Sequence, residues 1–122
     1  KINVSNAAGD CIDLSFGSYF IENAYVNKCG DKGLSVGEKS TIYLSKMEIK
    51  NSEIGIASKD SSITKLDEAK IKNIKTCLAA YNKKKEFSGG VIEIEKLSCE
   101  NFVKKIEFDK LSKIKEGVKV NK

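Results

Sequence analysis

Apolar and polar residues alternate along this chain in short triplets that recur about every 22 residues. Every second residue of a triplet is apolar, which is the period of a β-strand with one buried face. A fixed period of this length predicts a stack of coils, because one unit cannot bury its apolar face alone. The first set of triplets is Ile12-Asp13-Leu14, Leu34-Ser35-Val36, Ile56-Ala57-Ser58, Leu78-Ala79-Ala80 and Ile106-Glu107-Phe108. The second set is Tyr19-Phe20-Ile21, Ile42-Tyr43-Leu44, Thr64-Lys65-Leu66 and Ile92-Glu93-Ile94.

A third set of triplets carries an amide two positions after its last apolar residue. Its apolar pairs are Ile2/Val4, Ala24/Val26, Met47/Ile49, Ala69/Ile71 and Leu97/Cys99. The residues that follow are Asn6, Lys28, Asn51, Asn73 and Asn101. Asparagines one coil apart are separated by roughly 4.8 Å, so their side chains can bond one another and the turn backbone. We interpret this column as structural; a row of amides that contacts a ligand is the alternative.

Three short strands per coil, without a stretch of helical spacing, favour an all-β fold over a leucine-rich repeat. The chain has no proline, which suits strands that donate hydrogen bonds to neighbours on both sides. We therefore predict a parallel β-helix, a solenoid of four to five coils that forms one domain over residues 1–122. Because the chain begins without Met and inside a third triplet, we expect it to be a fragment of a longer protein.

All 22 basic residues are lysines, and the formal net charge is +5. The lysines alternate with Glu and Asp at outward positions, a pattern typical of a solvated surface that discourages edge pairing. Nucleic-acid binding is not expected, because Arg is absent and the aromatic residues do not cluster. A membrane span is not expected either, because no run approaches about 18 apolar residues.

The four cysteines are predicted to be free thiols. Cys11 and Cys77 share a column but lie three coils apart, roughly 14 Å, beyond the reach of a disulfide. Cys29 and Cys99 lie close to a shared column and are also about three coils apart. A buried cysteine in a solenoid behaves as a small apolar residue.

One coil contains an insertion. Leu78 and Ile106 are 28 positions apart, so the segment from Tyr81 to Gly90 carries about six extra residues. It holds three consecutive lysines, an aromatic residue near each end, and a Gly pair that could serve as a hinge. Insertions in repeat arrays map to loops on one face, often the binding face. The alternative is a solvated loop with Phe87 against the core.

The outward positions of the first triplets are mostly small, which predicts a shallow groove with Tyr81 and Lys59 at its rim. Together with the lysine loop, such a groove would suit an acidic glycan or an acidic protein segment. The alternative is that a neighbouring segment or domain packs on these small residues. The candidate ligand-binding residues are Asp13, Ser35, Lys59, Tyr81, Lys83, Lys84 and Lys85.

Acidic residues at the corner before the first triplets could converge on a cation, as calcium prefers. They are Asp10, Asp13, Asp31 and Glu53. Lys32 and Lys75 share that corner and would neutralise them, so no metal and no other cofactor is expected. No residues are assigned a catalytic role, since no general base has a supporting group that the sequence reveals.

Three segments carry a family resemblance: Gly30 to Ser40, Ile54 to Ser62, and Cys77 to Tyr81. They resemble the right-handed parallel β-helix of the pectate-lyase-like superfamily. More narrowly, they are similar to β-helix segments of bacterial surface or secreted proteins that accompany spore-coat-H-type kinase or lamin-tail domains. The resemblance implies a right-handed coil and a location outside the cell or on its surface.

The chain departs from the enzymes of that superfamily at their active sites. The lyases use a basic residue, usually Arg, and the related hydrolases and epimerases use motifs with His; this chain has neither residue. We therefore expect a non-catalytic scaffold or binding module of a bacterial extracellular protein. The alternative is a fragment of a carbohydrate-active lyase, hydrolase or epimerase whose catalytic residues lie outside this chain. A third possibility is assembly, with an adjacent domain or another coil stacked on the N-terminal edge.

Overall fold

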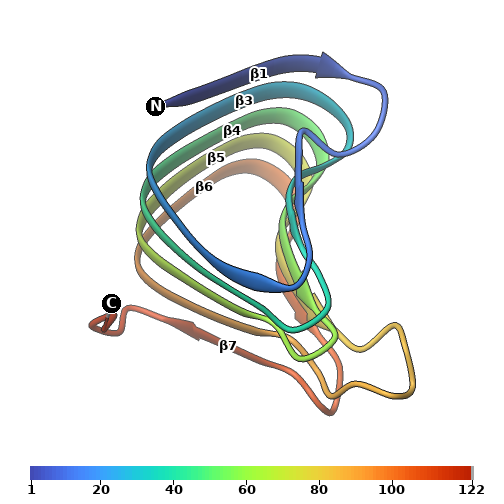
Figure 1. Ribbon diagram of the computed structural model, residues 1–122. Coiled ribbons are helices and arrows are strands. Elements are labelled where there is room, and N and C mark those ends of the chain that lie inside the picture. Colours follow the sequence, from blue (N-terminus) through green and yellow to red (C-terminus); the bar gives the residue numbers. More distant parts are fainter. Residues whose placement is uncertain (122) are drawn as a thin grey trace.

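The computed structural model, which describes residues 1–121, is a parallel β-solenoid of about five turns (Figure 1). All strand pairs are parallel, in the order β1-β3-β4-β5-β6-β7, and β2 lies beside the last part of β3. The described chain contains no helix, and hence none that could cross a lipid bilayer. The strands are β1 (Ile2–Ala7), β2 (Ile12–Leu14), β3 (Gly17–Val36), β4 (Ser40–Lys59), β5 (Ile63–Tyr81), β6 (Val91–Phe108) and β7 (Lys113–Glu116).

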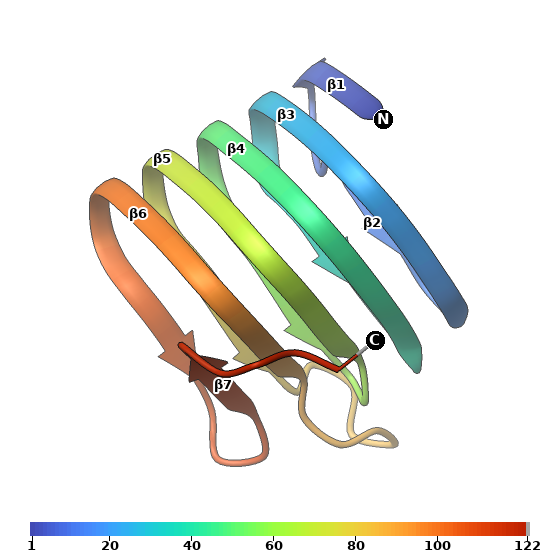
Figure 2. The same ribbon diagram turned by 90° about the vertical axis from the view of Figure 1, so that its left-hand side faces the viewer.

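The three predicted triplets share one long strand in each coil instead of forming three separate strands. Strands β3 to β6 each bend around most of a coil and stack one behind the other (Figures 1 and 2). The bend that follows the third triplet has left-handed backbone conformation, with φ of +55° at Asn51 and +57° at Lys28. Asparagine tolerates this conformation better than most residues, which explains its recurrence there. From β3 to β6 the three predicted short strands run on into one another, because a single left-handed residue turns the chain without ending the hydrogen-bond ladder.

The asparagine column is structural, as predicted. The side-chain amide of Asn101 donates to Oδ1 of Asn73 (2.6 Å), and that of Asn73 donates to Oδ1 of Asn51 (3.0 Å). Asn51 in turn donates to Oδ1 of Asn27 (2.8 Å). Asn27 thus supplies the amide in the second coil, where Lys28 occupies the left-handed position. The ladder therefore reaches the second coil, where the sequence pattern is interrupted.

The predicted columns pair residue by residue in the structure. Leu34 pairs with Ile56, Ile42 with Thr64, and Ile71 with Cys99. The inward residues of these columns form one core down the axis of the stack. At the two ends of the stack the core residues are only partly buried, among them Ile2, Val4, Leu97 and Ile106.

Inside this core, glycine makes room for isoleucine of the next coil. A Cβ added at Gly33 would lie 2.7 Å from Cγ2 of Ile49, and one at Gly55 would lie 3.1 Å from Cγ2 of Ile71. The contact at Gly33 would be too short for a real Cβ, and the one at Gly55 would be tight; a Cβ at Gly55 would also lie 2.5 Å from the carbonyl oxygen of Cys77. Each glycine therefore leaves room for the isoleucine and for the backbone of the next coil. In the following coil both positions are cysteine, at 77 and 99.

The four cysteines form two disulfides, so the prediction of free thiols was wrong. Cys77 bonds Cys99 and Cys11 bonds Cys29, with Cα–Cα distances of 6.4 and 5.4 Å. Both distances lie in the usual range for disulfides. The prediction considered only cysteines stacked along the axis, whereas these pairs join different columns within two successive coils. Cys29 is also not in the column of Cys99. It pairs with Ser52, whereas the column of Cys99 runs back through Ile71 and Ile49 to Val26.

The C-terminal segment turns back over the outside of the stack. Gly117 has φ of +76° and its N–H donates to the carbonyl of Ile94. The chain then runs over the outward side of the second triplets (Figure 2), where Nζ of Lys65 donates to the carbonyl of Asn121 (3.0 Å). Val120 is buried there. This segment leaves the outward side of the third triplets uncovered.

Candidate functional site

The inserted segment forms a corner loop, residues 82–90, that projects from the corner between the first and second triplets (Figure 1). A buried carboxylate, that of Asp60, fixes its beginning. Oδ1 of Asp60 accepts hydrogen bonds from the backbone N–H groups of Lys83 (2.7 Å) and Lys84 (2.9 Å) and from the amide of Asn82 (3.3 Å). Asp60 is fully buried and adopts φ of +53° just beyond β4. Asp60, in the third coil, thus fixes the loop that belongs to the fourth coil.

Asn82 and two glycines fix the rest of the corner loop. The amide of Asn82 donates to the carbonyls of Lys84, Phe87 and Ser88 at 2.8 to 2.9 Å. Gly89 and Gly90 are buried, and a Cβ on Gly90 would lie 1.8 Å from the carbonyl oxygen of Ser58. The glycines therefore permit close backbone packing. The prediction that they form a hinge was wrong.

The three consecutive lysines of the corner loop are exposed. Lys84 donates to Oε2 of Glu38, and this hydrogen bond lowers the pKa of Glu38 from 4.5 to about 2. Lys83 and Lys85 have no carboxylate within 4.0 Å among the residues that the structure describes. Phe87 is half-buried, with Nζ of Lys39 5.9 Å from its ring centroid. The loop therefore presents two unpaired cations on a fixed backbone.

The predicted groove is closed along its middle. Its outward column pairs as expected, but Ser35 and Ala57 are fully buried and Ala79 is 2% exposed. Asp13, at one end of the column, is exposed. The side chain of Lys59 crosses Gly37, since a Cβ there would lie 3.8 Å from Cε of Lys59. The absence of a side chain at Gly37 thus leaves room for Lys59, and Ser35 does not reach the surface.

Tyr81 lies half-buried at the edge of this covered strand. Burial raises the pKa of its phenol, and the charges of Lys32, Asp31, Asp10 and Asp60 also act on it. Tyr81 is therefore near the acidic corner as well as at the base of the lysine loop. The structure brings together Lys59, Tyr81 and the corner loop through adjacent coils, whereas Asp13 lies at the far N-terminal end of the column.

The acidic corner is neutralised by lysine. Nζ of Lys32 lies 2.9 Å from Oδ2 of Asp31 and 3.6 Å from Oδ1 of Asp10, and Lys75 lies 3.6 Å from Glu53. Among residues 1–121 no three His, Cys, Asp or Glu side chains are grouped so that they could hold a metal ion. The corner is thus a set of internal ion pairs.

A second surface was treated as an ordinary solvated face in the sequence analysis. It is the third-strand face, formed by the outward residues of the third triplets on β4, β5 and β6. These are Lys46, Glu48, Lys50, Glu68, Lys70, Lys72, Lys96, Ser98 and Glu100. A hollow of about 230 Å³ lies on it, and one of about 470 Å³ adjoins it, lined by residues of β1 and β3 as well as β4. The 22-residue repeat could have identified this face, because the alignment of coils that predicts the columns also places Lys50 opposite Lys72.

Comparison of the chain with models of protein families, with curated proteins and with solved structures finds no match. The function is therefore argued from the geometry of the two surfaces. Both offer ammonium groups, and each lies on a backbone fixed by hydrogen bonds to neighbouring coils. Such an arrangement can attract and position anions.

Proposed function

We propose that this chain is a non-catalytic solenoid module of a bacterial extracellular or cell-surface protein, and that its corner loop binds an acidic ligand. One observation carries the proposal: Asp60 and Asn82 fix the loop, while Lys83 and Lys85 remain exposed with no carboxylate partner among residues 1–121. A loop fixed in this way loses little conformational entropy on binding. The ammonium groups of Lys83 and Lys85 are available to a ligand because they form no ion pair within the described chain.

The described polar groups support a binding role over a catalytic one. The most connected hydroxyl cluster joins Ser58, Ser62 and Thr64, with Ser58 Oγ 2.6 Å from Ser62 Oγ and 3.0 Å from Thr64 Oγ1. All three residues are fully buried, so no substrate reaches them. A hydroxyl nucleophile also needs an adjacent base, and the groups next to these hydroxyls are other hydroxyls and a backbone carbonyl.

Two features support the proposed location and family. Disulfides persist mainly in oxidising compartments, so the pairs Cys11–Cys29 and Cys77–Cys99 favour a protein exported from the cytosol. The stack of parallel coils is the fold that the resemblance to the pectate-lyase-like superfamily implies. Membership of that superfamily is part of the proposal.

Charge reversal at the corner loop tests the proposed function. In Lys83→Glu/Lys85→Glu, affinity for polygalacturonate or for poly-L-glutamate should fall at least about tenfold, because each attraction of about 1 kcal/mol becomes a repulsion. The measurement is titration calorimetry with each probe at about 50 mM and about 300 mM salt, where the wild-type affinity should also fall at the higher concentration.

The matched control is Lys115→Glu/Lys119→Glu, which changes the net charge equally at exposed positions of the C-terminal segment. It should change the affinity less than twofold. Unchanged binding in the loop variant, or an equal loss in the control, would show that the corner loop is not the binding site.

A further inference from the structure

The third-strand face carries charges in a nearly regular alternation across the strands. Strand pairing places Lys46 opposite Glu68 on the next strand, and Glu68 opposite Lys96 on the one after. Glu48 lies opposite Lys70. Opposite charges facing each other across strands stabilise a sheet by about 0.2 to 1 kcal/mol per pair. Most of this face is therefore accounted for by the fold.

One pair breaks the alternation. Lys50 on β4 lies directly opposite Lys72 on β5, whose other neighbour is Glu100 on β6. Like charges in this position destabilise a sheet. None of the five lysines of this face has a carboxylate within 4.0 Å among residues 1–121, and Nζ of Lys50 lies 5.8 Å from the ring centroid of Tyr25. What distinguishes Lys50 and Lys72 is that on this face they alone are like charges placed directly opposite each other.

The hollow of about 230 Å³ lies at this break in the pattern. Three cations line it, Lys50, Lys70 and Lys72, together with Glu48, Ile71, Ser98 and Glu100. The larger hollow of about 470 Å³ adjoins the face beside Tyr25 and Lys46. Lys50 and Lys72 therefore place two cations about 4.8 Å apart on neighbouring strands, and Lys70 adds a third on β5.

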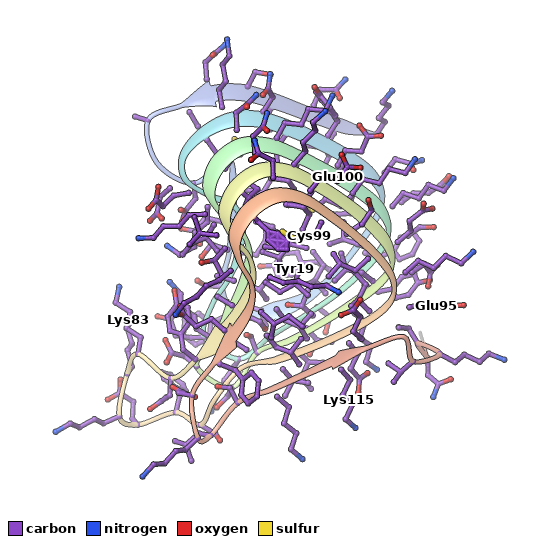
Figure 3. All side chains as sticks on the ribbon, turned by 180° about the vertical axis from the view of Figure 1, so that it is seen from behind. Tyr19, Lys83, Glu95, Cys99, Glu100 and Lys115 are labelled. Carbon is purple, nitrogen blue, oxygen red and sulfur yellow. A yellow bond between two sulfur atoms is a disulfide. The ribbon has the colours of Figure 1, made fainter. Side chains whose placement is uncertain are left out.

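We propose that the hollow lined by Lys50, Lys70 and Lys72 binds the carboxylate or sulfate groups of an anionic polysaccharide. An anionic group between Lys50 and Lys72 replaces their repulsion with two attractions, and a polymer places further anions along the face. This site goes beyond the proposed function because it lies away from the corner loop. Figure 3 shows Glu100, on this face, and Lys83, on the loop, at different sides of the coil.

The composition of the face favours a polysaccharide over a protein partner. Protein interfaces are depleted in Lys and Glu at their centre and are anchored by aromatic residues or Arg in pockets. Eight of the nine residues of this face are Lys or Glu, and the ninth is serine. A flat array of ammonium groups instead suits a ligand that brings many anionic groups and few apolar ones.

The test uses the variant Lys83→Glu/Lys85→Glu as its parent, so that the corner loop does not contribute to binding. In that parent, adding Lys50→Glu should weaken binding of dextran sulfate, of polygalacturonate, or of both, at least about tenfold. The two probes show whether sulfate or carboxylate is preferred. In the parent itself, amide shifts on adding the probe should centre on Lys50, Lys70, Lys72 and Ser98.

Lys50→Glu also completes the cross-strand alternation, because Glu at position 50 would face Lys72. The unfolding midpoint at low salt should therefore rise by about 1 to 3 °C while binding is lost. A lysine that served only the stability of the sheet would not give a higher unfolding midpoint together with weaker binding. Lys115→Glu is the control of equal charge and should leave binding within twofold of the parent.

Three results would overturn the proposal. They are undiminished polysaccharide binding by Lys50→Glu, a lower unfolding midpoint in that variant, and poly-L-glutamate binding as tightly as either polysaccharide, which would assign the face to an acidic protein. Should Lys50→Glu fail to fold, Lys50→Gln removes the charge without reversing it, and binding equal to that of the parent would then exclude the site. None of these results depends on whether the corner loop binds a ligand.

Discussion

At the scale of single residues, one position in the core is filled in two ways. Gly33 and Gly55 each receive an isoleucine of the next coil, Ile49 and Ile71. One coil later, Cys77 and Cys99 occupy the equivalent pair of positions as a disulfide. In the Gly/Ile pairs the isoleucine side chain fills the space, whereas in the Cys/Cys pair the two side chains share it. The core should therefore accept a change from Cys/Cys to Gly/Ile when both positions are substituted together.

The double variant Cys77→Gly/Cys99→Ile should fold and be more stable than Cys77→Ala/Cys99→Ala. Both lose the disulfide, which is worth about 3 kcal/mol for a loop of this length. The isoleucine regains about 2 to 5 kcal/mol of core packing relative to alanine, and glycine costs up to about 1 kcal/mol. Urea unfolding measures the difference. Equal stability of the two variants would contradict the proposed equivalence.

At the scale of elements, the period-two pattern predicted the columns, because a slip of one residue would expose every core side chain. It also located the insertion, whose length follows from the spacing of Leu78 and Ile106. The groove was not predicted correctly, since Ser35, Ala57 and Ala79 are buried and the alternation of residues does not show which small outward positions become covered. The hydrogen bonds of Asp60 were equally hidden, because they join residues 22 to 24 positions apart.

The ion pair between Glu38 and Lys84 makes the attachment of the corner loop pH-dependent. Glu38 has a pKa of about 2 in the folded chain against an ordinary 4.5, so its stabilisation is complete above the higher value and is lost as the pH falls toward 2. The wild type should unfold a few degrees higher than Glu38→Gln at neutral pH.

Melting curves of both proteins between about pH 2 and pH 7 measure this difference. It should shrink steadily below about pH 4.5 and vanish near pH 2. The Gln variant is a matched comparison because it keeps the size and the hydrogen-bonding oxygen of the side chain. A difference that does not change with pH would contradict the assignment.

At the scale of the whole molecule, each coil contacts mainly its immediate neighbours, so stability is a sum of local terms and unfolding starts at the ends. The disulfides lie at those ends. Cys11–Cys29 joins the first two coils and Cys77–Cys99 joins two coils near the C-terminal end. The strand pairs between them, β3 with β4 and β4 with β5, depend on hydrogen bonds and packing.

Reduction should therefore loosen the ends more than the middle. Hydrogen exchange in β1, β2 and the second half of β6 should accelerate by up to about 100-fold on adding a reductant, in line with about 3 kcal/mol per disulfide. Exchange in β4 should change least. Mass spectrometry of peptides from oxidised and reduced protein measures this, and a uniform increase along the chain would contradict it.

The buried carboxylate of Asp60 has a consequence for how the chain finds its order of coils. Coils of similar length and pattern could stack with one of them skipped, since the apolar columns would still match. Only the coil that follows β5 brings the N–H groups of Lys83 and Lys84 to Asp60. A chain that skipped a coil would leave this fully buried carboxylate without its donors, at a cost of several kcal/mol. Asp60 thus favours the native order of coils over a stack in which one coil is skipped.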